Sequence, residues 1–327
     1  MTNHPMSLDQ VLMVISLSTY VVGALLLILY FFSRDEWQRN LAIPIVIVGC
    51  LAQFGQLVAR YELTGVWPLL NLYGSLSLFS AMSVAIFIVF AFKYRLWFAG
   101  GFVIAIAAMF LAYALTWNEG TLPAVPSLQS YWAKIHVPLV VSSYASFLVS
   151  FVMSGLYLVK YYFERRLGFT ETALQPAAAT AGGDTALSSV AYSDEADVSV
   201  RRDTPNIASA ASSGNPAALW LNTLPSLAQM DVLIYRIIAV GLPLLTLGII
   251  TGAWWAKEAW GAYWQFDPKE TAALFSWIVY AVYMHLHTRN DWRGVRCAWV
   301  SVVGFASIIF CYLGVNIFIS GLHSYKM

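Results

Sequence analysis

Residues 254–270 read WWAKEAWGAYWQFDPKE and lie between two apolar runs that are each long enough to cross a membrane. The segment holds six aromatic rings among several charged side chains. Tryptophan and tyrosine are common at membrane interfaces, but an interfacial belt needs only about one or two rings at each helix end. Six rings in one connector therefore indicate a platform for a large planar ligand.

The composition is that of a polytopic membrane protein. Of the 327 residues, 59% are hydrophobic and only 11% are charged, whereas a soluble domain carries about 25% charged residues. The net charge of +1 gives no indication of a nucleic-acid partner. The three cysteines, Cys50, Cys297 and Cys311, form no CxxC pair, so no dithiol redox motif is present. The N-terminus lacks a basic stretch, and no cleavable signal peptide is expected.

The hydrophobic pattern predicts an all-α fold with about eight transmembrane helices. The expected spans are 9–32, 41–59, 68–92, 97–116, 136–161, 233–255, 271–288 and 297–319. These spans divide the 18 lysines and arginines into 13 on one set of loops and five on the other. The positive-inside rule places the richer set in the cytoplasm. Both termini and the tryptophan-rich connector are then expected on the outer side.

Three parts follow from this pattern. Residues 1–170 hold the first five spans, and residues 218–327 hold the last three with the connector at 254–270. Residues 171–217 between them are rich in alanine, serine, glycine, threonine and aspartate. Such a segment cannot bury enough apolar surface to offset its ordering entropy. We predict a disordered, dispensable cytoplasmic linker.

The five histidines fall into distinct places in this topology. His136 begins the fifth span and His323 follows the eighth, both on the outer side, whereas His285 and His287 end the seventh span on the inner side. His4 lies in the N-terminal tail. A lone histidine in an apolar helix is more often a satisfied polar residue than a ligand. Two histidines that converge on one aromatic platform favour a ligand role, because imidazole is a common axial ligand of haem iron.

Several motifs together resemble the CcsA (ResC) family of system II cytochrome c maturation. The connector resembles the family's tryptophan-rich signature (the WWD domain), which reads roughly WGxYWxWDPKE. The stretches LQSYWAKIHV (128–137), GLHSY (321–325), YAVYMH (280–285) and NLYGSL (71–76) resemble further family patterns. The signature departs at Phe266 and Ala272, where tryptophan is usual in the family.

The resemblance implies a function in cytochrome c biogenesis. The family moves haem b across the membrane and attaches it through thioether bonds to the CxxCH motif of apocytochrome c. The activity is that of a holocytochrome c synthase component, and it implies a CcsB (ResB) type partner and thiol-reducing proteins that keep the apocytochrome reduced. The expected location is the bacterial cytoplasmic membrane, or the thylakoid membrane in a plastid.

The resemblance also implies the site residues. His136 and His323 would bind the haem iron on the outer side, and His285 would bind haem within the membrane together with the partner subunit, with His287 as the nearby alternative. The aromatic residues expected to pack the haem are Trp255, Trp260, Tyr263 and Trp264. Asp267 would assist thiol chemistry as a catalytic residue. Alternatively, Asp267, Lys269 and Glu270 only cap the seventh span.

Three other functions remain open from the sequence. A plain transporter would use the aromatic side chains to line a substrate path. A haem-holding assembly subunit would bind haem without catalysis. An electron-transfer subunit with b-type haem would need pairs of histidines on facing helices of this chain, which the five histidines do not supply in this topology.

Overall fold

The computed structural model describes residues 7–65, 67, 71–117, 130–166, 220–221 and 223–318, and the regular structure in these ranges is entirely helical. This confirms the predicted all-α class. The helices are α1 (Leu8–Ser33), α2 (Glu36–Thr64), α3 (Leu72–Tyr94), α4 (Trp97–Leu115), α5 (Tyr131–Arg166), α8 (Leu227–Trp260), α9 (Pro268–His287), α10 (Val295–Ile309), the π turn η4 (Phe310–Gly314) and α11 (Val315–Phe318).

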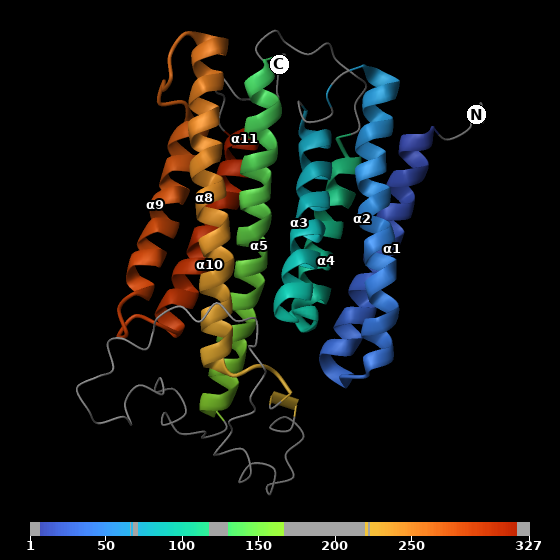
Figure 1. Cartoon of the computed structure of the whole chain (residues 1–327), viewed down its shortest axis with the longest axis vertical. Coiled ribbons are helices and arrows are strands. Elements are labelled where there is room, and N and C mark those ends of the chain that lie inside the picture. The colour runs from blue at the N-terminus through green and yellow to red at the C-terminus, as the bar shows by residue number, and fades with distance from the viewer. Residues whose placement is uncertain are drawn as a thin grey trace, which may run out of the picture.

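Seven helical segments of the described chain are long and apolar enough to cross a membrane: α1 to α5, α8, and α10 continued through η4. The seventh predicted span corresponds to α9, which is absent from that group but lies in the same bundle beside α8 and α10 (Figure 1). The side chains that α9 buries are polar or amphipathic, namely Ser276, Tyr280, Tyr283 and His287. These residues lower the mean hydropathy of α9 without removing it from the bundle.

Local sequence signals set the ends of α8 and α9. Ser226 and Gln229 form a capping box at the start of α8. Gly261 ends the helix with φ of 82°, and its N–H donates to the Lys257 carbonyl, a geometry that glycine adopts without a steric penalty. Asp267 then caps α9, and Pro268 occupies the first helical position, where its missing N–H costs nothing.

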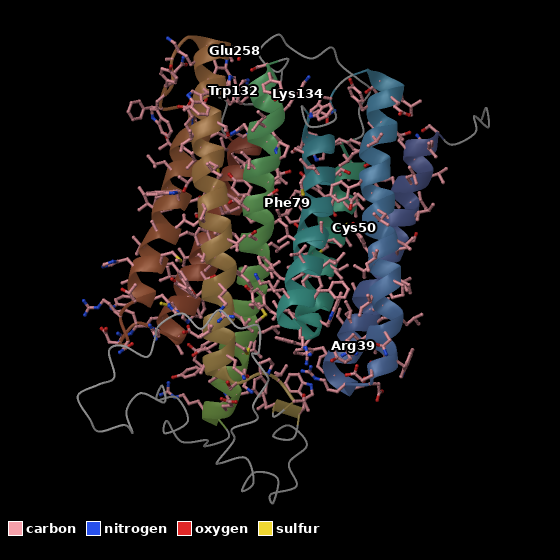
Figure 2. All side chains as sticks on the ribbon, viewed as in Figure 1. Arg39, Cys50, Phe79, Trp132, Lys134 and Glu258 are labelled. Carbon is pink, nitrogen blue, oxygen red and sulfur yellow. The ribbon has the colours of Figure 1, made fainter. Side chains whose placement is uncertain are left out.

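The bundle has two distinct ends. Helices α1 to α4 lie on one side and α5, α8, α9 and α10 on the other, with α3 packed against α5 (Figure 1). We call the end where α8 meets α9 the tryptophan end; α1 and α5 also begin there (Figure 1). The turns between α1 and α2, α3 and α4, and α9 and α10 lie at the opposite end (Figure 1). Figure 2 labels Trp132, Lys134 and Glu258 at the tryptophan end and Arg39 at the opposite end.

A row of glycines on α8 lets α5 approach closely. A Cβ atom added at Gly241 would lie 2.8 Å from the Phe147 ring, and one at Gly248 would lie 2.6 Å from a Val140 methyl group. Small residues at helix interfaces are typical of close helix pairs in membranes. The α5–α8 pair is therefore fixed by contacts that leave no room for a side chain on α8.

Gly241→Ala should destabilise the bundle by about 1–3 kcal/mol, because the new methyl group overpacks against Phe147. Gly55→Ala is a matched control, since its Cβ would meet only the Leu12 methyl group at an ordinary 3.5 Å, and alanine is the better helix former. Thermal unfolding of both variants in detergent checks the difference. Equal stability of the two variants would contradict a tight α5–α8 seam.

The π turn η4 directs two neighbouring residues to different helices. The Cys311 thiol donates to the Lys269 carbonyl of α9 at 3.7 Å. The Tyr312 hydroxyl donates to Ser75 Oγ of α3 at 3.2 Å. The last helical stretch therefore ends between the start of α9 and the start of α3, at the tryptophan end.

The predicted linker, 171–217, lies outside the described residues. The described chain resumes at Trp220, whose indole N–H donates to the Phe31 carbonyl at the end of α1, at 2.9 Å. The C-terminal end of α5, which is Arg166, also lies at the opposite end of the bundle, as the ribbon of α5 shows (Figure 1). Both flanks of the predicted linker are therefore at the end away from the tryptophan-rich segment.

Candidate functional site

Most of the tryptophan-rich segment is helical, although the sequence predicted a connector between two spans. Trp254 to Trp260 form the last turns of α8, residues 261–267 form a short irregular connection, and Pro268 to Glu270 begin α9. No glycine or proline occurs between Trp254 and Trp260, so the helix continues well past the predicted span end at 255. The aromatic residues at 254, 255 and 260 are consequently held on a rigid element.

His136 lies in the second turn of α5 and packs directly against α8. Its Nδ1 lies 2.8 Å from the Gly248 carbonyl oxygen, and its ring stacks on Trp255 with centroids 5.7 Å apart. A carbonyl can only accept, so Nδ1 carries a proton, and in the neutral ring Nε2 then carries the lone pair. Metal-binding histidines commonly donate their second N–H to a backbone carbonyl in this way. The geometry thus suits His136 to bind iron through Nε2.

The predicted aromatic residues divide into two groups. Trp255 is buried and contacts both His136 and Trp260, whose ring centroid is 5.0 Å away. Tyr263 is exposed, with the Lys257 ammonium 5.7 Å from its ring centroid. Trp264 is half-buried beside the Phe266 ring. The structure therefore places Trp255 against His136 and Trp260 against Trp255, whereas Tyr263 and Trp264 lie in the connection between α8 and α9.

Two features of this cluster were missed from sequence. Trp132 on α5 packs against Trp254 on α8 with ring centroids 4.7 Å apart; its position one turn before His136 was the available signal. Gly252 is the second feature, because a Cβ there would lie 2.7 Å from His136 Cε1 and 2.8 Å from Nδ1. The histidine ring occupies the space that glycine leaves on α8.

Asp267 has the geometry of a helix cap. Its side chain accepts from the Lys269 N–H at 3.0 Å, and the Glu270 side chain accepts from the Asp267 N–H at 3.2 Å. The Asp267 side chain is buried, with 5% of the residue exposed. These contacts give the capping interpretation its structural basis, while a direct part in thiol chemistry stays a prediction.

The two histidines near the end of α9 have opposite environments. His287 is 6% exposed, and its Nε2 donates to Asp231 Oδ2 at 2.9 Å. Tyr235 and Tyr283 stack on the His287 ring with centroids 4.5 and 5.9 Å away. His285 is exposed on the outside of the bundle. A ligand shared with another subunit would need an accessible imidazole, which His285 has; its role as a haem ligand stays a prediction.

Comparison with known proteins decides the family. A family model described as Cytochrome C assembly protein matches residues 69–323. The chain belongs to the cytochrome c assembly family. Relatives named Cytochrome c biogenesis protein CcsA include that of Porphyra purpurea, 35% identical over 309 residues, which cover 90% of this chain and 89% of the relative. That of Gloeobacter violaceus is 33% identical over 308 residues, which cover 90% and 88% of the two chains.

A solved structure shares the fold of this cytochrome c assembly protein. The structure named Cytochrome c Heme Lyase CcmF superposes with a TM-score of 0.60 at 16% sequence identity. The match covers 95% of this chain but 48% of the other. This chain therefore corresponds to about half of that larger protein, and at this identity the likeness concerns the fold alone.

The part of the chain that matches the cytochrome c assembly family holds every predicted iron ligand. The range 69–323 begins just before α3, contains His136, residues 254–270 and His285, and ends at His323. His323 lies outside the described residues, so its pairing with His136 stays a prediction. Helices α1 and α2 precede the matched range.

Proposed function

We propose that this chain binds haem at the tryptophan end and takes part in attaching it to apocytochrome c. The observation that carries the proposal is the His136 contact: Nδ1 bonds to the Gly248 carbonyl while the ring stacks on Trp255. This arrangement fixes the ring orientation and the tautomer that iron binding through Nε2 needs. Family membership supports the role in cytochrome c assembly.

The substrates would be haem b and an apocytochrome with a CxxCH motif. Each cysteine S–H adds across one haem vinyl group, the sulfur bonding to one vinyl carbon and the hydrogen to the other, so the addition is balanced without a net oxidant. His136, with His323 as the proposed second ligand, would hold the iron. Trp255 and Trp260 would pack the macrocycle and exclude water. The main contribution of these residues to the reaction rate would be to hold the haem vinyl groups and the cysteine thiols in the correct relative position.

The chain is an integral membrane protein, with seven described helical segments able to cross a membrane. We place the tryptophan end on the outer side of a bacterial cytoplasmic membrane, or of the thylakoid membrane in a plastid, because the positively charged loops favour this orientation. A CcsB/ResB-type subunit would complete the holocytochrome c synthase. Thiol-reducing proteins would keep the two apocytochrome cysteines available.

Haem translocation is a second proposed step, and the exposed position of His285 favours it. His285 lies in the last turn of α9, and this end of α9 lies away from the tryptophan end (Figure 1). A polar side chain that faces outward from a membrane helix is costly unless it meets a partner. His285 would therefore hold haem with a histidine-bearing partner subunit before the haem reaches the tryptophan end.

Trp260→Ala should lower haem affinity by about five- to tenfold, because an aromatic contact is worth roughly 1 kcal/mol or more beyond its area. Trp260→Phe should retain most of the affinity, since a ring still packs against Trp255. The measurement pairs haem per polypeptide with thioether yield on a CxxCH reporter protein. Trp37→Ala, exposed at the first turn of α2, is the control for loss of a surface tryptophan.

The same experiment separates the alternative functions. Wild-type protein that carries no haem would overturn the proposal. Haem binding without thioether formation, in the presence of the partner subunit, would identify a haem-holding subunit instead. If Trp260→Ala keeps its full haem content and its full thioether yield, the aromatic segment is better explained as an interfacial belt.

His287→Ala should destabilise the fold by about 1–3 kcal/mol, because it removes the donor to Oδ2 of the buried Asp231 carboxylate and leaves the Gly294 N–H donating to Oδ1. His285→Ala should leave stability within about 0.5 kcal/mol, as expected for an exposed position, but should lower the haem content. Thermal unfolding and haem content of the purified complex check both variants. Normal stability with haem loss in His287→Ala, and retained haem in His285→Ala, would reverse the assignment.

A further inference from the structure

Phe266 has an unusual backbone and an unusual exposure. Its φ of 56° lies in the left-handed region, which a residue with a bulky side chain rarely adopts. The other non-glycine residues with positive φ in the described ranges, Arg34 and Arg95, are C-caps of α1 and α3, where this geometry is common. Phe266 instead precedes the N-cap of α9, and 81% of the residue is exposed.

One carboxylate oxygen of Glu270 accepts hydrogen bonds from the residues before and after Phe266. Glu270 Oε2 accepts from the Gln265 N–H at 2.9 Å and from the Asp267 N–H at 3.2 Å, the two residues that flank Phe266. A capping box needs only the second of these bonds. The bond to Gln265 is additional, and it closes the chain around Phe266. Gln265 Nε2 also donates to the Trp260 carbonyl at 3.1 Å, which ties the turn to the end of α8.

The turn presents an aromatic ring that buries little surface within the chain. The Phe266 ring meets Trp264 edge-on, with centroids 6.2 Å apart, and otherwise faces outward. Strained backbone at an exposed aromatic residue persists only when the surrounding contacts enforce it. Here Glu270 enforces it, and the ring that results lies in the same segment as the proposed haem site.

We infer that Glu270 is a positioning residue of the external haem site, acting through Phe266. Its carboxylate fixes the left-handed turn so that the exposed Phe266 ring supplies one apolar wall for the planar macrocycle. The inference rests on the proposed haem-binding function and adds a role for Glu270 that capping alone does not require. Glu270 itself touches no reacting atom in this account.

A double-mutant cycle tests whether Glu270 acts through Phe266. Haem affinity is measured for the full chain, purified from membranes with any copurifying subunit, as wild type, Glu270→Ala, Phe266→Gly and the double variant. Glu270→Ala alone should lower the affinity about five- to tenfold, a typical range for coupled neighbours. In the Phe266→Gly background the same change should cost less than about twofold, because the ring to be positioned is gone. Glu258→Ala, exposed on the last turn of α8, is the matched control.

A conservative variant keeps the test valid if Glu270→Ala fails to accumulate. Glu270→Gln retains a side-chain oxygen that can accept both N–H groups, so it should bind haem within about twofold of wild type. Equal losses from Glu270→Ala in both backgrounds, or no loss in either, would overturn the inference, as would a Glu270→Gln variant with a tenfold loss. Absence of haem from the wild-type protein would instead refute the proposed function, so the two failures are distinguishable.

Discussion

His136→Gly should lower the haem affinity of the tryptophan end by about a hundredfold or more. Changes to groups that merely support a metal ligand cost about 10- to 100-fold, and removal of the ligand itself should exceed that. The Nδ1 bond to Gly248 and the stack on Trp255 are lost in the same change. Haem per polypeptide, the absorption spectrum and thioether yield on a CxxCH reporter measure the effect.

Added imidazole should restore the spectrum of His136→Gly, because the cavity left by the side chain can accept the free ligand. Lys134→Gly provides the matched control, since it introduces the same helix penalty of about 1 kcal/mol at an exposed position one half-turn away. A His136→Gly variant with wild-type haem content and cytochrome c output would refute His136 as a ligand.

Gly252→Val should displace the His136 ring and lower haem affinity by about tenfold or more, although position 252 needs no contact with haem. Its Cβ would lie 2.7 Å from His136 Cε1, closer than carbon atoms approach without a bond. The ring must therefore leave its bond with the Gly248 carbonyl, which orients it. The measurement is the haem affinity and the axial-ligand spectrum of the purified variant.

Gly155→Val controls for a β-branched residue in a helix, since a Cβ at Gly155 meets no atom within 4 Å. Gly252→Ala should fall between Gly252→Val and the wild type in haem affinity. Equal haem affinity in Gly252→Val and Gly155→Val would show that the α5–α8 contact does not position His136.

The sequence was sufficient for the fold class and for the ends of several helices. Long apolar runs predicted the helical bundle. The alternative in which Asp267 caps the seventh span agrees with the start of α9 at Pro268, which precedes the predicted start at 271, because capping is decided by a few neighbouring residues. The end of α8 was predicted too early. Hydropathy falls at the charged residues Lys257 and Glu258, but helix geometry continues until Gly261 changes the backbone.

The close approach of α5 and α8 could not be predicted in the same way. His136 and Gly248 are far apart in sequence, and neither residue alone indicates that a carbonyl of one helix meets the imidazole of the other. The distinction between His285 and His287 also depends on packing. The position of His285 in the motif YAVYMH favoured it as the ligand. Only the structure shows that His287 is buried because it forms a hydrogen bond with Asp231 on α8.

The π turn at Phe310–Gly314 has a consequence for how the last helix can vary between relatives. A π turn contains one residue more than an α turn, so it acts as a single-residue insertion that the helix absorbs. Cys311 and Tyr312 lie within this turn and contact α9 and α3. A homologue that lacks one residue here would still have a last helix long enough to cross the membrane. Its side chains after the deletion would, however, point in different directions around the helix axis. In this segment, alignment gaps of one residue therefore carry more structural information than substitutions between apolar side chains.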